Sequence, residues 1–532
     1  TSNTSGNENT ALGMWALNTN TTGIENTALG SRTLYSNDSG GYNTALGYYA
    51  LYDNTTGSGN TALGSRTLIK NTTGALNTAM GTRALQENIT GTENTATGYY
   101  ALRLNTTGDY NTASGSRSLY SNTTGDQNTA LGYRSLYTND KSNYNVALGY
   151  GALESHTGGA SGNTYNTAVG YKALNASSVG GNNVALGYHA LYSNVSGHRN
   201  IAIGHNALDE ADAEHDNLAI GNYALGAAIN DAEYNVAIGN KALEDNISGD
   251  DHVAIGYEAL KQNTTGYRGV AIGRGALDAN TSGHNNVGVG YLALSSNLTS
   301  GDNTAIGTQA LDISTGASNT AIGYKAGDAN MSGQQNVVIG ATADASAANA
   351  INQIVIGYGA TGTGNNEIAL GNTSISAIKA QVNSITAYSD RRIKREINDS
   401  KLGLDFIMKL RPVTYKMKNP ADYPDEILED RFRMDVTSGP NNEATDFRPA
   451  DDQTIYDGLI AQEVKEAIDE AGVNWSGWSE NESDGKQGVQ YGALTIPLIK
   501  AVQEQQETIN SLKKENQELS DRLKAIEKAL LR

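Results

Sequence analysis

Residues Asn43 to Gly59 read NTALGYYALYDNTTGSG, and this 17-residue unit recurs along most of the 532-residue chain. Its motif glycine, Gly47, is one of 22 that end motifs such as NTALG or NVAIG between Gly13 and Gly371. The steps between these glycines are 17 residues, apart from one step each of 21, 18, 16 and 14. Such a regular short period indicates an array in which each unit packs mainly against its neighbours.

The unit is too short for a helical hairpin or a propeller blade, which take about 33 residues or more. It contains two short segments, T/V-A-L/I-G and Y-x-A-L, separated by turn residues such as Asn54 to Gly57. Turns of this composition tolerate the left-handed backbone that sharp corners require. We therefore predict a mainly β fold, a β-solenoid with one coil per unit and parallel stacked strands. At about 4.8 Å per coil, the rod is on the order of 100 Å long.

The predicted interior consists of small apolar side chains, with Ala45 and Leu46 from the first segment and Ala50 and Leu51 from the second. All three phenylalanines of the chain lie beyond residue 388, so one such coil buries little apolar surface for its length. Association of several copies around a common axis covers more of that surface. We predict a trimer, although the period alone does not fix the number of copies.

A different kind of sequence begins at residue 389. All six prolines lie beyond residue 388, and charged residues rise from 44 among the first 388 to 49 among the last 144. The two parts carry net charges of −12 and −7, which argues against nucleic acid as a partner. No apolar run reaches the roughly 20 residues of a membrane span. Without cysteine there are no disulfides or thiolate metal sites, and we expect no cofactor.

The last segment carries a heptad pattern over about five heptads, flanked by Glu and Lys. Residues 496–532 are therefore predicted to form an oligomeric coiled coil. A helical hairpin within the domain is the alternative, but the remaining domain is short for burying such a helix. The two rows of the pattern are Val502, Ile509, Asn516, Leu523 and Leu530, and Leu498, Gln505, Leu512, Leu519 and Ile526. The polar Gln505 and Asn516 are interpreted as specifiers of register and oligomeric state.

The motif Asn-Val-Ala-Ile-Gly, as in Asn235–Gly239, resembles the head repeat of trimeric autotransporter adhesins. That resemblance implies a left-handed parallel β-roll with three chains per trimer. The last step, from Gly357 to Gly371, has the 14-residue length usual in that family.

Four ordered blocks of the last 144 residues resemble a second family, the intramolecular chaperone autoprocessing domain of peptidase family S74. They are Ser389–Lys394 (SDRRIK), Leu410–Tyr415 (LRPVTY), Gly458–Val464 (GLIAQEV) and Tyr491–Leu494 (YGAL). The resemblance implies a domain that trimerises three chains, aligns the elongated part and then cuts itself off. By position, the cut falls between Tyr388 and Ser389, and such domains terminate phage tail fibres and tailspikes.

The resemblance assigns Ser389 as nucleophile and Lys394 as its base, with Asp390 as a possible helper. A serine hydroxyl needs a neighbour to take its proton, and lysine does so only when burial or nearby positive charge lowers its pKa. Arg391, Arg392 and Arg395 are candidates to supply that charge. Without the neighbouring blocks, a serine and a lysine in a charged stretch are ordinarily surface residues. We expect no metal at this site.

Repeated side chains of the rod have both structural and functional interpretations. Exposed tyrosines are able to stack on sugars, but we expect those after the motif glycine to pack on one another along the rod. Recurrent Asn-x-Thr/Ser sequences match glycosylation acceptors, although a role in turns explains them equally. The tyrosines are Tyr48, Tyr99, Tyr133, Tyr150, Tyr171, Tyr188, Tyr257, Tyr291, Tyr324 and Tyr358.

Two places interrupt the regular array and are candidate binding loops: the step between Gly149 and Gly170, and the stretch from His205 to Glu233. The second stretch holds an acidic patch that is a candidate cation site, although a solvated loop fits its spacing better. The patch comprises Asp209, Glu210, Asp212, Glu214 and Asp216, near His205 and His215.

Taken together, the sequence predicts residues 1–371 as a solenoid shaft, 372–388 as a connector and 389–532 as a self-cleaving trimerisation chaperone. The predicted function is that of a homotrimeric phage tail fibre in the virion tail, a structural protein for host attachment. Its expected partners are a host cell-surface receptor, either a glycan or an outer-surface protein, and other tail or baseplate proteins. The alternatives are a bacterial trimeric surface adhesin and a secreted bacterial surface protein with the same chaperone. A glycan hydrolase is disfavoured because no separate catalytic domain fits before Ser389.

Overall fold

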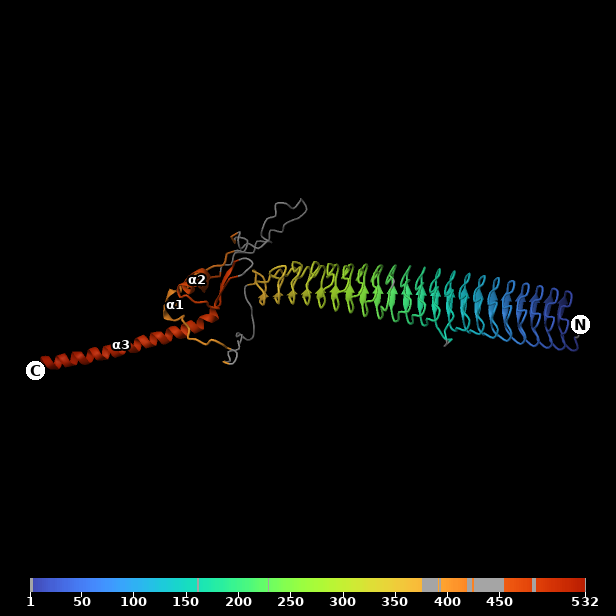
Figure 1. Ribbon diagram of the computed structural model, residues 1–532, viewed down its shortest axis with the longest axis horizontal. Coiled ribbons are helices and arrows are strands. Elements are labelled where there is room, and N and C mark those ends of the chain that lie inside the picture. The colour runs from blue at the N-terminus through green and yellow to red at the C-terminus, as the bar shows by residue number, and fades with distance from the viewer. Residues whose placement is uncertain are drawn as a thin grey trace, which may run out of the picture. The chain divides into compact units, whose positions relative to one another are not determined.

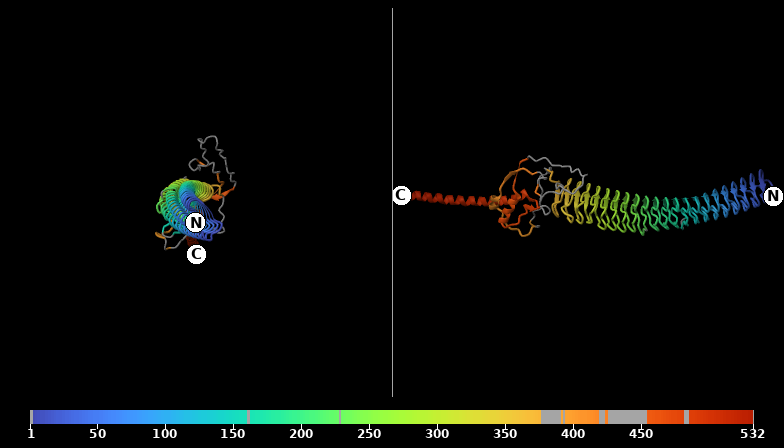
Figure 2. Two further views of the ribbon diagram at one scale, coloured as in Figure 1. Left: turned by 90° about the vertical axis from the view of Figure 1, so that its right-hand side faces the viewer. Right: turned by 90° about the horizontal axis from the view of Figure 1, so that it is seen from above.

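The computed structural model of the chain describes residues 3–159, 162–227, 229–375, 391, 394–418, 423–424, 454–480 and 485–531. The chain divides into two compact units, Thr1–Thr361 and Gly362–Arg532. In the first unit, short strands lie side by side in successive coils, as Figures 1 and 2 show.

The first 22 strands are each three residues long and correspond to the central residues of the repeated motif. Strands β1 to β21 pair in parallel, each with the next along the chain, and equivalent residues stay in register, as Ala45 does opposite Ala62. The prediction of a parallel β-solenoid with one coil per unit is therefore confirmed. The strands are β1 (Thr10–Leu12), β2 (Thr27–Leu29), β3 (Thr44–Leu46), β4 (Thr61–Leu63), β5 (Thr78–Met80), β6 (Thr95–Thr97), β7 (Thr112–Ser114), β8 (Thr129–Leu131), β9 (Val146–Leu148), β10 (Thr167–Val169), β11 (Val184–Leu186), β12 (Ile201–Ile203), β13 (Leu218–Ile220), β14 (Val236–Ile238), β15 (Val253–Ile255), β16 (Val270–Ile272), β17 (Val287–Val289), β18 (Thr304–Ile306), β19 (Thr320–Ile322), β20 (Val337–Ile339), β21 (Ile354–Ile356) and β22 (Ile368–Leu370).

Hydrogen bonds between coils continue beyond the strands. The N–H of Gly47 donates to the carbonyl of Leu29 in the preceding coil at 2.9 Å, and the N–H of Leu51 donates to Thr67 in the next coil at 3.0 Å. The second predicted segment, which includes Leu51, is a turn rather than a strand. Backbone bonding between coils therefore runs around the coil without a second regular strand.

Fewer side chains of each coil are buried in its interior than the sequence predicts. Ala45, Ala50 and Leu51 are fully buried, but Leu46 is 44% exposed. Successive side chains of a strand point to opposite faces, so an inward Ala45 places Leu46 outside. The prediction that Leu46 belongs to the core is wrong.

The motif glycine marks a position where only glycine fits. Gly47 has a φ of +134°, and a Cβ built on it would lie 2.5 Å from the carbonyl oxygen of Gly64 in the next coil. The left-handed corners of this coil also include Tyr49 (φ +59°) and Leu51 (φ +51°), rather than the predicted Asn54–Gly57 turn. The coil tolerates these corners because stacking on both sides fixes the backbone there.

Buried asparagine side chains connect the turns along the rod. The Nδ2 of Asn54 donates to Oδ1 of Asn37 in the preceding coil at 2.7 Å and to the carbonyl of Gly57 in its own turn at 2.9 Å. A second row begins each motif, where the backbone N–H of Asn60 donates to Oδ1 of Asn43 at 2.9 Å. Asn54 is fully buried, so its Asn-Thr-Thr sequence is a structural turn and inaccessible to a glycosylating enzyme in the folded rod.

Two histidines occupy asparagine positions of these rows. His252 replaces the motif asparagine: its Nδ1 accepts from the N–H of Gly269 at 2.9 Å, and its Nε2 lies 2.7 Å from the carbonyl of Gly266. His156 replaces the turn asparagine, with Nε2 3.0 Å from Oγ1 of Thr164. Burial lowers the pKa of His252 and lowers the pKa of His156 to about 4. Both rings are therefore neutral members of otherwise uncharged rows.

The second unit contains a small α+β fold with a long helix. Its elements after β22 are α1 (Leu404–Lys409), β23 (Val413–Tyr415), β24 (Tyr456–Gly458), α2 (Ala461–Glu470), β25 (Trp478–Glu480), β26 (Gln487–Val489), the 3-10 helix η4 (Tyr491–Leu494) and α3 (Thr495–Leu530). β23 pairs with β24 and β25 with β26, both antiparallel. The core is made of Leu402, Phe406, Val464, Ala467 and Ile468.

The short helix α1 contacts both longer helices, and its Lys409 forms an ion pair with Glu470 of α2 at 2.7 Å. Phe406 on its buried face lies edge-on to Trp475, with ring centroids 5.6 Å apart. At its start, the N–H of Leu404 donates to Oε2 of Glu504 on α3 at 2.7 Å. A Cβ on Gly403 would meet that carboxylate at 2.3 Å, so glycine is needed for this close approach.

Replacing Asn54 by alanine should destabilise the rod. The change removes the donor to the Asn37 side-chain oxygen and the acceptor of the Asn71 side-chain amide, while the Gly57 carbonyl keeps its second donor, Asn43. Each unsatisfied buried group costs about 1–3 kcal/mol. Thr56→Ala removes an exposed residue of the same turn and serves as the control. We expect hydrogen exchange in the neighbouring coils to accelerate in Asn54→Ala only. Equal protection in the two variants would contradict a structural role for the row.

Acidification should destabilise the rod through its buried histidines. The pKa of unfolded histidine is about 6.5, so the unfolded chain takes up protons first as the pH falls from there toward the folded value of about 4 for His156. The stability from a neutral His156 is complete above pH 6.5 and falls by about 3 kcal/mol across this window.

The test compares wild-type protein with the variant that carries both His156→Asn and His252→Asn. Unfolding midpoints measured between pH 7 and pH 4.5 should fall more steeply for the wild type. The raised pKa values of Asp209 and Asp344, each to about 6 through burial, act in the opposite direction but are present in both proteins. Parallel pH profiles would show that the two rings do not control the response.

Candidate functional site

The predicted cleavage segment is only partly described by the structure. Tyr388, Ser389, Asp390 and Arg392 lie outside the described residues, so the predicted serine–lysine pair stays a prediction. Lys394 is exposed, and its backbone N–H donates to the carbonyl of Arg391 at 3.2 Å.

The other three blocks of the C-terminal part, far apart in sequence, meet around one pocket. The pocket has a volume of about 320 Å³ and is lined by Tyr415 from the first block, the Leu459–Gln462 stretch from the second, and Tyr491 from the third, together with Gln487 and Val489. The blocks are therefore parts of one folded site.

Specific contacts hold the three blocks together. Arg411 forms an ion pair with Glu463 through two nitrogens, and the hydrogen bond from Arg411 lowers the pKa of that carboxyl. The hydroxyl of Tyr491 accepts from the N–H of Leu459 at 2.9 Å. A Cβ on Gly458 would lie 2.5 Å from that hydroxyl, so Gly458 allows the tyrosine to reach the strand end. Residues of different sequence blocks therefore contact one another in the folded domain.

Helix α3 presents a long apolar row to solvent. Its residues from Gln505 onward are almost all exposed, and Leu512 and Leu523 are 53% and 60% exposed. These leucines belong to the predicted heptad rows. An uncovered row on a 36-residue helix is typical of a chain that packs against further helices.

The outward face of the rod's strands is also apolar. The third strand residue points outward in each coil and is Leu or Ile in most coils, as Leu46, Ile255 and Ile272 show. Ile255 and Ile272 are 36% and 38% exposed. From β9 onward the first strand residue, also outward, is mostly Val or Ile rather than Thr. The face is interrupted at β6 and β7, where the third residues are Thr97 and Ser114. An exposed apolar face of this length marks an interaction surface.

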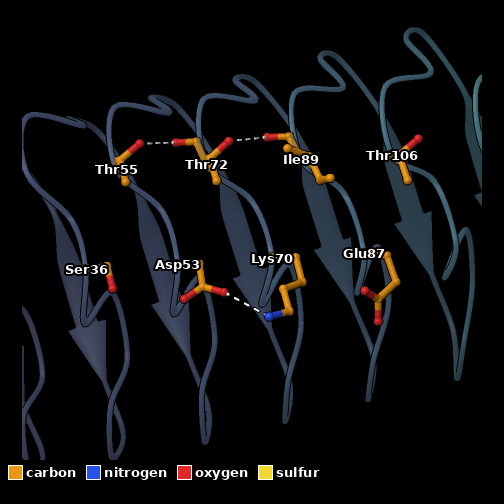
Figure 3. Close-up of a pocket in the computed structure, with 8 residues that line it drawn as sticks. All are labelled: Ser36, Asp53, Thr55, Lys70, Thr72, Glu87, Ile89 and Thr106. Atoms are coloured by element: carbon orange, nitrogen blue, oxygen red, sulfur yellow. Dashed lines mark hydrogen bonds and ion pairs between the residues drawn. The ribbon is translucent and has the colours of Figure 1, made fainter.

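A groove runs across several coils on another side of the rod (Figure 3). Its volume is about 590 Å³, and it lies between one row that contains Asp53 and Lys70, whose charged groups are 3.4 Å apart, and a second row of mostly threonines. The hydroxyl of Thr55 donates to the carbonyl of Thr72 at 2.9 Å along that second row. The lining residues are Ser36, Asp53, Thr55, Lys70, Thr72, Glu87, Ile89 and Thr106.

The tyrosines after the motif glycine pack along the rod where neighbouring coils carry them. Tyr133, Tyr150, Tyr171 and Tyr188 form a stack with ring centroids 5.2 Å apart at each step. The expected packing is therefore confirmed for this run. The rings remain partly exposed, with Tyr150 at 45%.

The irregular stretch from His205 to Glu233 uses its acidic side chains within the fold. Glu214 accepts hydrogen bonds from the N–H groups of Asp212 and Ala213 at 2.8 and 3.0 Å. Asp216 forms a two-pronged ion pair with Arg199, at 2.6 and 2.7 Å. Among the described residues, no group of three or more His, Cys, Asp or Glu side chains is placed to hold a metal ion.

Comparison with known proteins identifies the C-terminal part. Residues 389–473 match the peptidase S74 family, described as chaperone of endosialidase. This match confirms the second resemblance seen in the sequence, and with the β-solenoid it fits a fibre or adhesin that carries a C-terminal chaperone domain. A search of curated proteins found no match. In the part of the chain that the structure describes, no helix has the length and apolar character needed to cross a membrane.

Proposed function

Because residues 389–473 match the chaperone of endosialidase family and follow a β-solenoid in the chain, we propose that this protein is a trimeric fibre whose C-terminal domain directs assembly and then cuts itself off. The C-terminal domain brings three chains together and aligns their rods. It then separates from the rod by cleaving the Tyr388–Ser389 bond. The family match at residue 389 is the observation that carries this proposal.

The proposed cleavage uses Ser389 and Lys394. Lys394 accepts the proton of the Ser389 hydroxyl, whose oxygen attacks the carbonyl carbon of Tyr388. The amide bond is thereby exchanged for an ester, and the freed amine of Ser389 takes a proton. Water then hydrolyses the ester and leaves a carboxylate on Tyr388. The exposed side chain of Lys394 needs a change of environment in the assembled domain, because a serine base works best with a lowered lysine pKa.

Two uncovered apolar surfaces support a trimer. The heptad rows of α3 supply a seam for three helices, and the outward strand residues of the rod supply a long face for contact between solenoids. Both surfaces belong to parts that are predicted to associate, and both are apolar for most of their length. Burying them stabilises the assembly by roughly 25 cal/mol for each Å² of apolar area.

We place the finished rod in the tail of a phage virion, where it attaches to the host surface. A bacterial cell surface is the alternative location, since a trimeric adhesin needs the same rod and the same assembly. In either setting the C-terminal domain acts once on its own chain.

Whole wild-type protein should yield a fragment that begins at Ser389. Ser389→Ala removes the attacking oxygen and Lys394→Ala removes the base, so both variants should stay full length. The intact mass of the purified protein measures the outcome directly. Lys401→Ala changes an exposed lysine nearby and should be processed like the wild type. A wild-type chain that remains intact after prolonged incubation would contradict self-cleavage.

The outward strand face should be required for the trimeric rod. In the double variant Ile255→Lys and Ile272→Lys, six ammonium groups per trimer enter an apolar interface, where unpaired charges are strongly unfavourable. We expect sedimentation of the processed rod to show loss of the trimer.

The matched control is Gln262→Lys with Thr265→Lys, which adds the same charge at exposed positions of a turn. This variant should remain trimeric. A stable trimer formed by the strand-face variant would rule out this face as the interface.

A further inference from the structure

Each coil has a second outward wall, opposite its strand. In the Gly47 coil the outward residues of this wall are Tyr48, Tyr49 and Tyr52, the first, second and fifth after the motif glycine. The strand and this wall enclose the core between them. Gly288 occupies the inward strand position of its coil, and a Cβ built on it would lie 3.2 Å from the side chain of Leu277 and 3.1 Å from the carbonyl oxygen of Ala293. Both of these residues belong to this wall. The wall is therefore a surface separate from the apolar strand face.

The N-terminal eight coils carry an unusual composition on this wall, here called the Arg–Tyr face. Over the coils from Gly13 to Gly132, its three positions hold ten aromatic residues, six arginines and no Asp or Glu. The six are all the arginines of residues 1–145. They are Arg32, Arg66, Arg83, Arg103, Arg117 and Arg134, and the aromatic residues are Trp15, Tyr35, Tyr48, Tyr49, Tyr52, Tyr99, Tyr100, Tyr120, Tyr133 and Tyr137.

The same positions are different in the later coils. From Gly149 to Gly323 they hold seven acidic residues against five Lys or Arg. Both sets of coils have the same strands, core positions and stacking, so building the rod does not require arginine on this wall. The basic face also stands out against the chain's net charge of −19. Its charge is therefore a feature of the surface rather than of the fold.

Four of the six arginines of this face, Arg32, Arg83, Arg103 and Arg134, lie over aromatic rings. The guanidinium carbon of Arg32 is 4.6 Å from the ring centroid of Trp15, and that of Arg103 is 4.9 Å from Tyr100. Such contacts hold the guanidinium groups in place without neutralising their charge. Arg134 forms a salt bridge with Glu154, with its Nε 2.6 Å from Oε1. In the part of the chain that the structure describes, none of the other five arginines of this face forms a salt bridge.

A flat row of rings and guanidinium groups suits a polymer of acidic sugars. Tyrosine and tryptophan rings stack on the apolar faces of sugar rings, and the planar guanidinium group pairs with carboxylates through two hydrogen bonds. Each of the eight coils contributes an aromatic residue, an arginine or both, so a linear polymer meets such groups along its length.

We propose that the Arg–Tyr face binds a carboxylate-bearing polysaccharide. This binding rests on and deepens the proposed attachment role, and it is independent of self-cleavage. It also assigns attachment to the N-terminal coils rather than to the irregular stretches between Gly149 and Glu233.

The experiment measures binding of the processed protein to hyaluronan and polygalacturonate by biolayer interferometry at physiological salt. Neutral dextran and a single-stranded DNA of similar charge serve as the comparison ligands. The wild type should bind at least one acidic polysaccharide, and more tightly than dextran or DNA. Arg66→Gln with Arg117→Gln should weaken that binding about tenfold or more, because each substitution removes a charge-assisted contact.

The matched control is Lys241→Gln with Lys325→Gln, which removes two cations from the second position of later coils. It should leave binding unchanged, and thermal melting should be the same for all three proteins. Absence of binding to both acidic polymers, equal binding to DNA, or equal loss in the control pair would each overturn the proposal. The intact mass of the same samples reports self-cleavage separately, so failure of one proposal is distinguishable from failure of the other.

Discussion

The stacking of one coil on the next is the constraint on which the rest of the rod depends. Parallel strands approach at about 4.8 Å only if nothing larger than hydrogen occupies the motif glycine position, where a Cβ on Gly47 would collide with Gly64. At that distance the turns also come close enough for Asn54 to reach Asn37 and extend the bonding into the interior. Apolar burial is small in each coil, so directional hydrogen bonds specify the register.

This division of roles leaves the outside of the rod free to vary. The inward positions are occupied by small residues, such as Ala45 and Ala50, and at the buried polar position of His252 the two ring nitrogens reproduce the asparagine contacts. Outward positions have no such restriction. The strand face is consequently apolar along most of its length, while the opposite wall changes from arginine and tyrosine to a more acidic surface.

The C-terminal unit is held together by contacts between distant parts of the chain rather than between successive repeats. Its small core is built by helices and hairpins that are distant in sequence, and contacts such as Arg411–Glu463 and Leu459–Tyr491 join the blocks. The long helix α3 contributes only its first turns to this unit, through residues such as Glu504, and exposes most of the remainder. Most helical stability in proteins comes from packing of an apolar face, and most of the apolar row of α3 is exposed in this unit.

The repeat period and the motif glycine by themselves determined the parallel solenoid, because a 17-residue unit has room for one coil and one short strand. The ordered blocks likewise identified the chaperone domain, and the heptad rows located α3. Tertiary structure decided which side of each strand faces inward, and so moved Leu46 from the core to the surface. It also buried the asparagines of the Asn-x-Thr sequences in rows. A local turn motif contains no information about the coils on either side of it, and those coils supply two of the three hydrogen bonds of the Asn54 side chain.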